Sequence, residues 1–559
     1  MAKPRPFLMG CLILAGVIIA VALICVCITS LIDSNCPEGS FSNAAVAADS
    51  LICSEIGRKM LQQGGSAVDG AIAALLCTSV VNPQSMGIGG GSIVTVRSAT
   101  GHYQVYNFRE TVPRSVKANL LKECPTTFSF STGPQWIGVP GELRGYETLH
   151  KQYGKLPWAK LFEPTVQMAR DGIPLPVYLT NFMKADIVKD YVEKSSLCGI
   201  LCNKNKTVLG KGDTLKFTKL AETLEAIAMK GADEFYAGRI GHDLVHDIKA
   251  AGGALNMEDL KSFKVKVENT WAVPLGETTI HIPPPPAGGT LLAFILKIMQ
   301  GFALTPNSFV GDHKTQTYHH YIEAAKFANG QKRNIRDPAF HSKKSVDHLI
   351  DASFTNRIRK MISPNRTHDN SYYKNINPSS DHFGTTHVSV IDKDGLSVSA
   401  TSTINQLFGG AVYSPRTGII LNNELADFCG RADTLTAGEQ PPSSMTPMIV
   451  EWTSGDFLVI GGSGGSLITT SVALTIINHL WLGMNLKDAI NAPIVFIDSL
   501  NNVNFEPGFD KSVIDSLRVL GHNLGKWKFF LNVVNAVKKE KSCIVAVSDS
   551  RKMGASAGY

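Results

Sequence analysis

The sequence predicts an α+β fold in which helices cover stacked β-sheets. Residues 141–260 are mostly helical in pattern, with proline and glycine stops between the helices. From residue 385 onward the chain changes to segments that alternate apolar and polar residues, as half-buried strands do. The chain has 559 residues, 44% of them hydrophobic and 18% charged, so it can bury a large core. Helices packed outside stacked sheets would bury the apolar faces of both.

The N-terminal elements follow in order along the chain. Residues 44–80 have helical apolar spacing, interrupted at Gly64-Gly65 and ended by Pro83. The stretches "GIGGGSIVTVRS" and "YQVYNFRE" predict two strands around a turn at Thr100-Gly101. Further on, "TTIHIPPPPAGGTLLAF" predicts a strand, a proline-rich turn and a helix.

Strand patterns dominate the C-terminal part. "TTHVSVIDKDGLSVSATSTI" alternates apolar and polar residues on both sides of Asp394-Gly395, which predicts a β-hairpin. Four more strands are expected in "GIILNNEL", "PMIVEW", "DFLVIGG" and "CIVAVSDSR". Between them, "SLITTSVALTIINHLWLG" predicts a helix.

An apolar segment near the N-terminus predicts a membrane anchor. Residues 7–32 carry no charge over 26 positions, which is long enough to cross a bilayer. Lys3 and Arg5 precede the segment and Asp33 follows it, so residues 1–6 should be a cytoplasmic tail and the body should lie outside the plasma membrane, as a single-pass type II protein. The alternative is a cleaved signal peptide, although the apolar region of such a peptide is usually only about 7–15 residues long. In both cases the body enters an oxidising compartment.

Cysteine and asparagine positions agree with that compartment. Eight cysteines lie outside the apolar segment, enough for up to four disulfides whose pairing does not follow from their positions. Asn205-Lys-Thr and Asn365-Arg-Thr are glycosylation acceptor triplets and fit an extracellular surface.

Several kinds of site are not expected. The net charge of +7 is small and scattered, so no nucleic-acid partner is expected. Neither His319-His320 nor His382 and His387 form a metal-ligand spacing with a nearby Cys, Asp or Glu, so no metal is expected. "GIGGGS" does not fit the dinucleotide motif and lacks a surrounding βαβ unit, so no cofactor is expected either.

One candidate nucleophile is Ser463, at the centre of "GGSGG". This stretch matches the G-x-S-x-G turn of serine hydrolases, between a predicted strand and a predicted helix. Ser463 is followed along the chain by Asp510 or Asp515 and then by His522, the order Ser-Asp-His. A Ser463-dependent esterase is therefore one hypothesis.

The other candidate nucleophile is Thr385, which opens the first strand of the hairpin. By residue type alone it would be an ordinary strand threonine. If the chain were cut before it, however, Thr385 would gain a free α-amino group with a pKa of about 7.7–8.0. Such an amine can act as general base for the hydroxyl of its own residue, with no separate histidine.

Longer motifs identify a family. "GTTHVSV" (384–390), "SATSTIN" (399–405), "NNELADF" (422–428), "PSSM" (442–445) and "GGSGG" (461–465) resemble the γ-glutamyltransferases. So do "VVNPQSMGIGGG", "FRETVPR", "GVPGELRGY" and the ending "SDSRKMGASAGY". The likeness covers nearly the whole chain after the apolar segment. "PPPPAGG", "YSPRTGIILNNEL" and "FFLNVV" are most similar to the animal members that hydrolyse leukotriene C4.

The resemblance implies a fold, a processing step and an activity. The fold would be the four-layer αββα sandwich of N-terminal-nucleophile hydrolases. One precursor would cleave itself before Thr385 into a large subunit, with residues 33–384 outside the membrane, and a small subunit, residues 385–559. The resulting heterodimer would cleave the γ-glutamyl bond of glutathione and of glutathione S-conjugates such as leukotriene C4. Water, or an acceptor amino acid or dipeptide, would then resolve the γ-glutamyl ester.

The same resemblance implies a role for each matching residue. Thr385 would be the nucleophile, Thr403 would orient it, and the backbone of Gly464 and Gly465 would form the oxyanion hole. A guanidinium is a planar fork that suits a carboxylate, and carboxylates suit an ammonium. Substrate binding would fall to Arg109, Ser443 and Ser444 for the α-carboxylate and to Asn405, Glu424 and Asp427 for the α-ammonium.

The resemblance also bears on cysteines and on one departure. Cys53 with Cys77 and Cys198 with Cys202 match the spacing of the family's large-subunit disulfides. The remaining four, Cys36, Cys124, Cys429 and Cys543, allow three pairings. Between Asp427 and Ser443 the chain has only "FCGRADTLTAGEQPP", shorter than in many relatives, which predicts a more open site for bulky conjugates. A catalytically inactive surface glycoprotein of the same fold is the remaining alternative.

Overall fold

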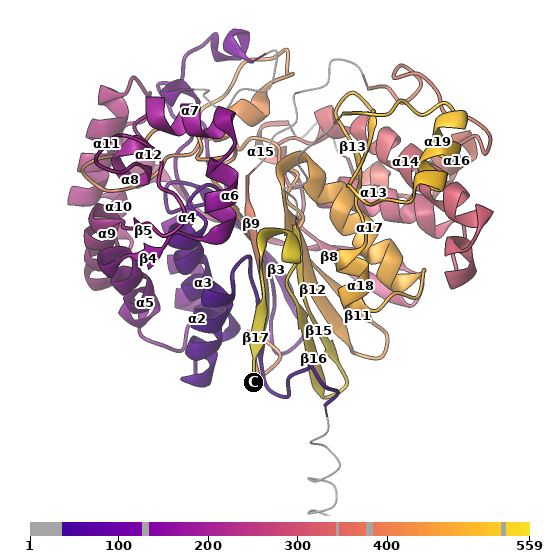
Figure 1. The fold of residues 1–559 in the computed structure, drawn as a ribbon, viewed down its shortest axis with the longest axis horizontal. Coiled ribbons are helices and arrows are strands. Elements are labelled where there is room, and N and C mark those ends of the chain that lie inside the picture. The colour runs from indigo at the N-terminus through magenta and orange to yellow at the C-terminus, as the bar shows by residue number, and fades with distance from the viewer. Residues whose placement is uncertain (1–35, 126–132, 342–345, 376–383, 527–532) are drawn as a thin grey trace, which may run out of the picture.

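Four layers build the molecule. The computed structural model describes residues 36–125, 133–341, 346–375, 384–526 and 533–559. Two β-sheets lie face to face in the middle, and helices cover their outer faces on the left and right of Figure 1. The predicted α+β sandwich, αββα, is therefore confirmed. The predicted membrane segment, residues 7–32, lies outside the described residues, and within them no helix is long and apolar enough to span a bilayer.

The first sheet contains the predicted hairpin at its centre. Its seven antiparallel strands run in the order β17-β1-β9-β10-β2-β3-β6. The hairpin strands pair Ser397 with Ile391 and Ser402 with Thr386, so Thr385 lies just before the first paired residue of β9. The strands are β1 (Ala45–Ala47), β2 (Gly91–Arg97), β3 (Tyr103–Asn107), β6 (Lys266–Asn269), β9 (Thr386–Ile391), β10 (Ser397–Thr403) and β17 (Ser556–Gly558).

The second sheet has six strands in the order β16-β15-β12-β11-β8-β7. Its strands are β7 (Trp271–Leu275), β8 (Thr278–Ile282), β11 (Met448–Trp452), β12 (Phe457–Ser463), β15 (Val533–Glu540) and β16 (Cys543–Val547). Ile449, Val459 and Val537 from this sheet meet Ile391 of the first in a buried apolar layer. At Gly461 the sheets approach so closely that a Cβ would lie 2.3 Å from the His387 ring, so only glycine fits there.

Helices cover the first sheet from one side. The helix α3 is buried along its whole length because its sequence is apolar on every face, and a Ser66–Asp69 capping box fixes its start. The larger helices of this layer are α2 (Leu51–Gln62), α3 (Ala67–Val81), α4 (Glu142–Tyr153), α5 (Trp158–Asp171), α6 (Val177–Met183), α7 (Asp186–Lys194), α9 (Thr218–Lys230), α11 (Arg239–Ala250) and α12 (Met257–Ser262).

A second helical layer covers the other sheet. The predicted helices after the proline-rich turn and after "GGSGG" form α13 and α17, which pack against each other and against this sheet. The layer comprises α13 (Gly289–Gln300), α14 (Asp312–Asn329), α16 (Ala352–Met361), α17 (Ile468–Leu480), α18 (Leu486–Asn491) and α19 (Lys511–Val519).

Two expected elements differ from the structure. Residues 45–47, predicted as helical, form strand β1 between β9 and β17, where small residues satisfy the backbone hydrogen bonds of two neighbours. "GIILNNEL" forms only isolated bridges at Ile420 and Leu421 rather than a strand. There the Asn422 side chain bonds the carbonyls of Gly89 and Gly138, so side chains replace the strand ladder.

Candidate active site

Thr385 lies buried at the start of β9 with its hydroxyl held by a second threonine. Its Oγ1 donates to Oγ1 of Thr403 at 3.1 Å, and its backbone N–H donates to the Ser85 carbonyl at 3.0 Å. Thr403 ends β10, and its hydroxyl oxygen also accepts the N–H of Asn405 at 2.8 Å. Thr385 has a φ of +83°, a conformation that threonine rarely adopts. Strain at a buried hydroxyl residue is typical of functional sites.

The glycine turn after β12 lies against the peptide bond that precedes Thr385. The backbone N–H of Gly464 donates to the carbonyl oxygen of Gly384 at 3.1 Å. Gly464 has a φ of +117° and Gly465 a φ of +59°, so the turn needs glycine. Gly384 is equally restricted, because a Cβ there would lie 1.9 Å from the Asn405 carbonyl oxygen.

Ser463 is not arranged as a nucleophile, so the serine esterase hypothesis is wrong. Its side chain is fully buried, and its Oγ accepts a hydrogen bond from the Lys552 ammonium at 2.8 Å. The two alternative acids, Asp510 and Asp515, are paired near the protein surface with Lys314 and Lys511. The third expected member, His522, has both ring nitrogens bonded to other residues. The G-x-S-x-G pattern therefore marks a tight strand-to-helix turn.

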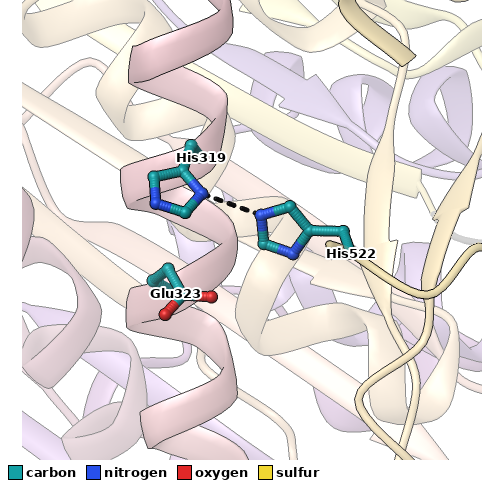
Figure 2. Close-up of side chains that lie close together, drawn as sticks. All are labelled: His319, Glu323 and His522. Atoms are coloured by element: carbon teal, nitrogen blue, oxygen red, sulfur yellow. Dashed lines mark hydrogen bonds between the residues drawn. The ribbon is translucent and has the colours of Figure 1, made fainter. Parts of the chain in front are cut away.

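His522 belongs to a buried polar network beside α14 (Figure 2). Its Nε2 lies 2.8 Å from Nδ1 of His319, and the Lys326 ammonium lies 2.9 Å from its Nδ1. Burial lowers the pKa of His522 to about 2, so the ring is neutral. His319 in turn contacts the Ser363 carbonyl, and Glu323 accepts from Thr367 and Tyr373. His319, Glu323 and His522 lie close enough together to hold a metal ion, a grouping that the spacing of these residues in the sequence did not predict.

A cavity of about 460 Å³ opens beside Thr385. Its walls come from both halves of the chain, which the sandwich brings together. Nearly all the expected site residues line it: Arg109, Thr385, Thr403, Asn405, Glu424, Asp427, Ser443, Ser444 and Gly465. Gly464 adjoins this set through its bond to Gly384.

Arg109 is buried in the wall of the cavity, between two carboxylates. Its guanidinium contacts Glu424 at 2.5 Å and Asp427 at 2.6 Å. It also donates to the carbonyls of Pro441 at 2.8 Å and Pro442 at 2.7 Å. All three guanidinium nitrogens thus have protein partners, so a substrate carboxylate has to share these N–H groups or displace one partner.

Two buried carboxyl groups next to Arg109 compete for one negative charge. Burial raises the pKa of Glu424 to about 8, although the positive charge of Arg109 opposes the rise. Burial and the charge of Glu424 raise the pKa of Glu110 well above its usual value. Close carboxyls do not both ionise readily, so this burial and mutual repulsion disfavour a second negative charge beside Arg109.

The remaining expected residues differ in how firmly they are held. Asn405 has a φ of +71° and donates from its amide to the Asn423 carbonyl at 3.1 Å. The Ser443 hydroxyl accepts the N–H of Met445 at 3.1 Å, and the Ser444 carbonyl accepts from Thr469. Asn405, Ser443 and Ser444 all line the cavity, and the Ser443 hydroxyl, which accepts one hydrogen bond, can still donate one to a ligand.

Four disulfides bridge the eight cysteines outside the apolar segment. Two join Cys53 to Cys77 and Cys198 to Cys202, the pairs that the family resemblance implies. The two pairs left open are Cys36–Cys543 and Cys124–Cys429. The last of these joins the short connection after Asp427, where Cys429 lines the cavity, to Cys124 in the N-terminal part of the chain. Both glycosylation acceptors, Asn205 and Asn365, are exposed.

Sequence reasoning missed three residues of this site. Glu110 directly follows Arg109 in "FRETVPR", and Lys552 lies in the C-terminal motif, so both residues could have been found from the family motifs. Asp49 had none, because it lies in a segment predicted as helical. The Lys552 ammonium joins Asp49 at 2.8 Å and the Thr385 carbonyl at 2.7 Å.

The four-layer αββα fold places the chain in the class of N-terminal-nucleophile hydrolases. Cephalosporin acylase from Bacillus halodurans has this fold, with a TM-score of 0.82 and 22% identity over 94% of this chain and 97% of that one. The gamma-glutamyltranspeptidase of Helicobacter pylori has a TM-score of 0.54 and 26% identity, covering 60% of this chain and 95% of that one.

The family follows from sequence comparison. The model of the gamma-glutamyltranspeptidase family matches residues 53–559. Glutathione hydrolase 5 proenzyme of Rattus norvegicus is 44% identical over 98% of both chains, and scoloptoxin SSD14 of Scolopendra dehaani is 35% identical over 92% of both. The chain belongs to the gamma-glutamyltranspeptidase family, and it is an enzyme that hydrolyses or transfers γ-glutamyl groups.

Proposed function

We propose that this enzyme cleaves the γ-glutamyl bond of glutathione and of its S-conjugates, leukotriene C4 among them, at the cell surface. The observation that carries the proposal is the position of Thr385 between the Thr403 hydroxyl and the backbone donor of Gly464. The printed names of the rat and plant relatives, which are glutathione hydrolases, support the substrate class.

Activation begins with cleavage of the Gly384–Thr385 bond. The Thr385 hydroxyl attacks the Gly384 carbonyl carbon, whose oxygen accepts the N–H of Gly464. The acyl group passes from nitrogen to oxygen, and water hydrolyses the resulting ester. This releases the Gly384 carboxylate and frees the α-amino group of Thr385. The word "proenzyme" in the names of the mammalian relatives supports this maturation into a large subunit that ends at Gly384, with residues 33–384 outside the membrane, and a small subunit, residues 385–559.

Turnover then uses the same hydroxyl. The α-amino group of Thr385 takes the proton of its own hydroxyl, which attacks the γ-carbonyl of the donor. The oxyanion develops beside the N–H groups of Gly464 and Gly465. The amine leaving group departs with that proton, and water or an acceptor amine resolves the γ-glutamyl ester.

The donor's amino-acid end fits the Arg109 end of the cavity. Arg109 with the Ser443 and Ser444 hydroxyls would bind the α-carboxylate, while Asn405, Glu424 and Asp427 would receive the α-ammonium. Glu424 and Asp427 already contact Arg109, so the end of the cavity holds opposite charges a few ångströms apart. A zwitterionic α-amino acid group needs that arrangement.

Basic side chains are also present around the cavity, which suits the leaving group of glutathione. Lys332, Arg333 and Lys374 line it, and Arg333 and Lys374 have no acidic partner among the described residues. A cysteinyl-glycine leaving group carries a free carboxylate. The short connection after Asp427 forms one wall, where Cys429, Gly430 and Arg431 line the cavity, and its length supports admission of bulky S-substituents.

Location at the cell surface is part of the same proposal. The uncharged segment 7–32 supports a single-pass type II anchor, and the exposed acceptors Asn205 and Asn365 support glycosylation outside the cell. Four disulfides are typical of an oxidising compartment.

Electrophoresis of two variants tests the central claim. Wild-type protein should run as two chains under denaturing conditions, with Thr385 as the N-terminal residue of the smaller one. Thr385→Ala should remain one uncut, inactive chain, whereas Thr385→Ser, which keeps a hydroxyl, should mature at least partly. A Thr385→Ala protein that still matures and hydrolyses glutathione would refute the proposal.

A substrate pair tests the proposed openness of the site. The kcat/KM values for glutathione and for a bulky S-conjugate are compared with those of a relative that has the longer connection. We expect this enzyme to favour the conjugate more strongly than that relative does. Equal discrimination by both enzymes would exclude a role for the short connection.

A further inference from the structure

Lys552 is a buried cation at the centre of the catalytic apparatus, yet it does not line the cavity. It ends the 3₁₀ helix η8 (Ser550–Lys552) and is only 4% exposed. Each of its three N–H groups has an acceptor: Asp49 at 2.8 Å, the Thr385 carbonyl at 2.7 Å and the Ser463 hydroxyl at 2.8 Å. One side chain thus joins a large-subunit residue, the nucleophile and the turn that precedes Gly464.

Asp49 compensates the charge of Lys552 but is itself fully bonded. Its other contacts are the Thr386 hydroxyl at 2.7 Å and the Asn535 amide at 2.8 Å. A buried ion pair is a weak source of net stability, since desolvation offsets the attraction. The position of this pair, directly behind the reacting residue, therefore calls for a role besides stability.

The ammonium lies close to the atom that becomes the catalytic base. The Thr385 carbonyl oxygen is three bonds from the nitrogen of the same residue, so Nζ lies within about 6 Å of that nitrogen. After cleavage this nitrogen is an α-amino group, whose pKa would otherwise be about 7.7–8.0. A nearby positive charge disfavours the protonated amine, and only the unprotonated amine can accept the hydroxyl proton.

We propose that Lys552 is a positioning residue of the nucleophile, which orients Thr385 against the Gly464 turn and keeps its freed α-amino group unprotonated at neutral pH. The proposal rests on Thr385 being the nucleophile, as proposed above. The hydrogen bonds to the Thr385 carbonyl and to Ser463 supply the orientation. The charge supplies the effect on the amine.

Other charged groups near Thr385 set the size of that effect. Asp49 opposes Lys552, and on the cavity side Arg109 opposes Glu424 and Asp427. His387 on β9 adds no charge, because burial lowers its pKa to about 3. With this partial cancellation, we expect Lys552 to move the titration of the amine by about half to one pH unit.

The pH dependence of kcat/KM in the mature enzyme tests the proposal. In the pH profile, the limb is the rise of kcat/KM with increasing pH, which follows deprotonation of the Thr385 α-amino group. In Lys552→Gln this limb should shift to higher pH by about half to one unit. Lys552→Arg keeps the charge, so its limb should stay near the wild-type position even if its rate falls. A lowered rate or melting temperature with an unmoved limb in Lys552→Gln would mean a structural role only and would overturn the proposal.

Asp49→Asn provides an independent arm, which also serves if Lys552→Gln does not mature. Removing the anion leaves the ammonium uncompensated, so the limb should shift to lower pH. A limb that stays in place, or that moves to higher pH, would overturn the proposal.

The matched control is Lys487→Gln, which removes an exposed lysine without a partner among the described residues. Its limb should coincide with that of the wild type. A shift equal to that of Lys552→Gln would show a general charge effect and overturn the proposal. Failure of the underlying function is distinguishable, because it would appear as activity retained by Thr385→Ala.

Discussion

The backbone N–H of Gly464 donates to the carbonyl oxygen of Gly384, 3.1 Å away, in the chain whose Gly384–Thr385 bond is intact. This carbonyl precedes the residue proposed as nucleophile. One donor can therefore polarise the bond that is cut during maturation and later stabilise the oxyanion of the substrate reaction. The two reactions would need the same turn geometry.

Gly464→Ala tests that shared requirement. A φ of +117° is unfavourable for alanine, so the turn should shift and withdraw the donor. We expect slower maturation and, in the matured fraction, a kcat lowered about 100-fold or more. Gly508→Ala is a matched control, since its φ is also positive and nothing lies within 4 Å of its added Cβ. Normal maturation in Gly464→Ala would contradict a shared donor.

Thr403→Val tests the hydroxyl that holds Thr385. The substitution keeps the shape of the side chain but leaves the Thr385 hydroxyl and the Asn405 N–H without their partner. Loss of a buried hydrogen bond of this kind costs about 1–3 kcal/mol, so kcat should fall about ten- to hundredfold with little change in KM. Steady-state kinetics of the mature enzyme measure this. Thr403→Ser should recover most of the rate, and a failure to do so would point to packing rather than to the hydroxyl.

Glu424→Gln tests how the site recognises the α-ammonium of the donor. Because burial raises the pKa of Glu424 to about 8, its carboxylate population increases as pH rises toward that value. The KM for a γ-glutamyl donor should therefore decrease between about pH 6 and 8 in the wild type. In Glu424→Gln the KM should be higher and nearly independent of pH. A donor without the α-amino group serves as control, and pH dependence of its KM in the wild type would argue against this assignment.

His387 should make the fold sensitive to acid. Burial lowers its pKa to about 3 in the folded protein, whereas an unfolded histidine titrates near 6.5. Between these values the unfolded chain binds the extra proton, so stability is fully present above about pH 6.5 and declines as pH falls toward 3. The contribution to the free energy of unfolding is about 1.4 kcal/mol per pH unit in this window. Denaturant unfolding of wild type and His387→Gln should give a shallower decline for the variant, and equal slopes would exclude His387 as a source.

Part of the site was predictable because local patterns contain it. The alternation around Asp394-Gly395 predicted the hairpin that presents Thr385 and Thr403, and both strands are present. The glycine turn before α17 was predicted from "GGSGG". Glu424 and Asp427 were found by motif, although "GIILNNEL" contains no regular strand and a 3₁₀ turn, η6 (Glu424–Phe428), supports both residues.

Other parts could not be predicted, because they depend on partners far away in the chain. The sequence around Ser463 fits a nucleophile as well as a turn residue. Only the buried hydrogen bond from Lys552 to its hydroxyl shows that it is a turn residue. The cysteine positions alone allowed three pairings for the last four thiols. Tertiary packing selects the one that joins Cys36 to Cys543 and Cys124 to Cys429, which are separated by 507 and 305 positions along the chain.

The sequence by itself determined the family, the helical and strand segments of most of the chain, and the residue types around the reacting bond. Periodicity and motif order contain that information because they reflect local backbone preferences and side-chain chemistry. The tertiary structure decided which charges meet. Asp49 and Lys552 are 503 positions apart and converge on Thr385 only because β1, next to Asp49, and the C-terminal strand β17, just after Lys552, are neighbours in one sheet. Burial then gives these contacts their strength, since a charge withdrawn from water requires a partner at close range.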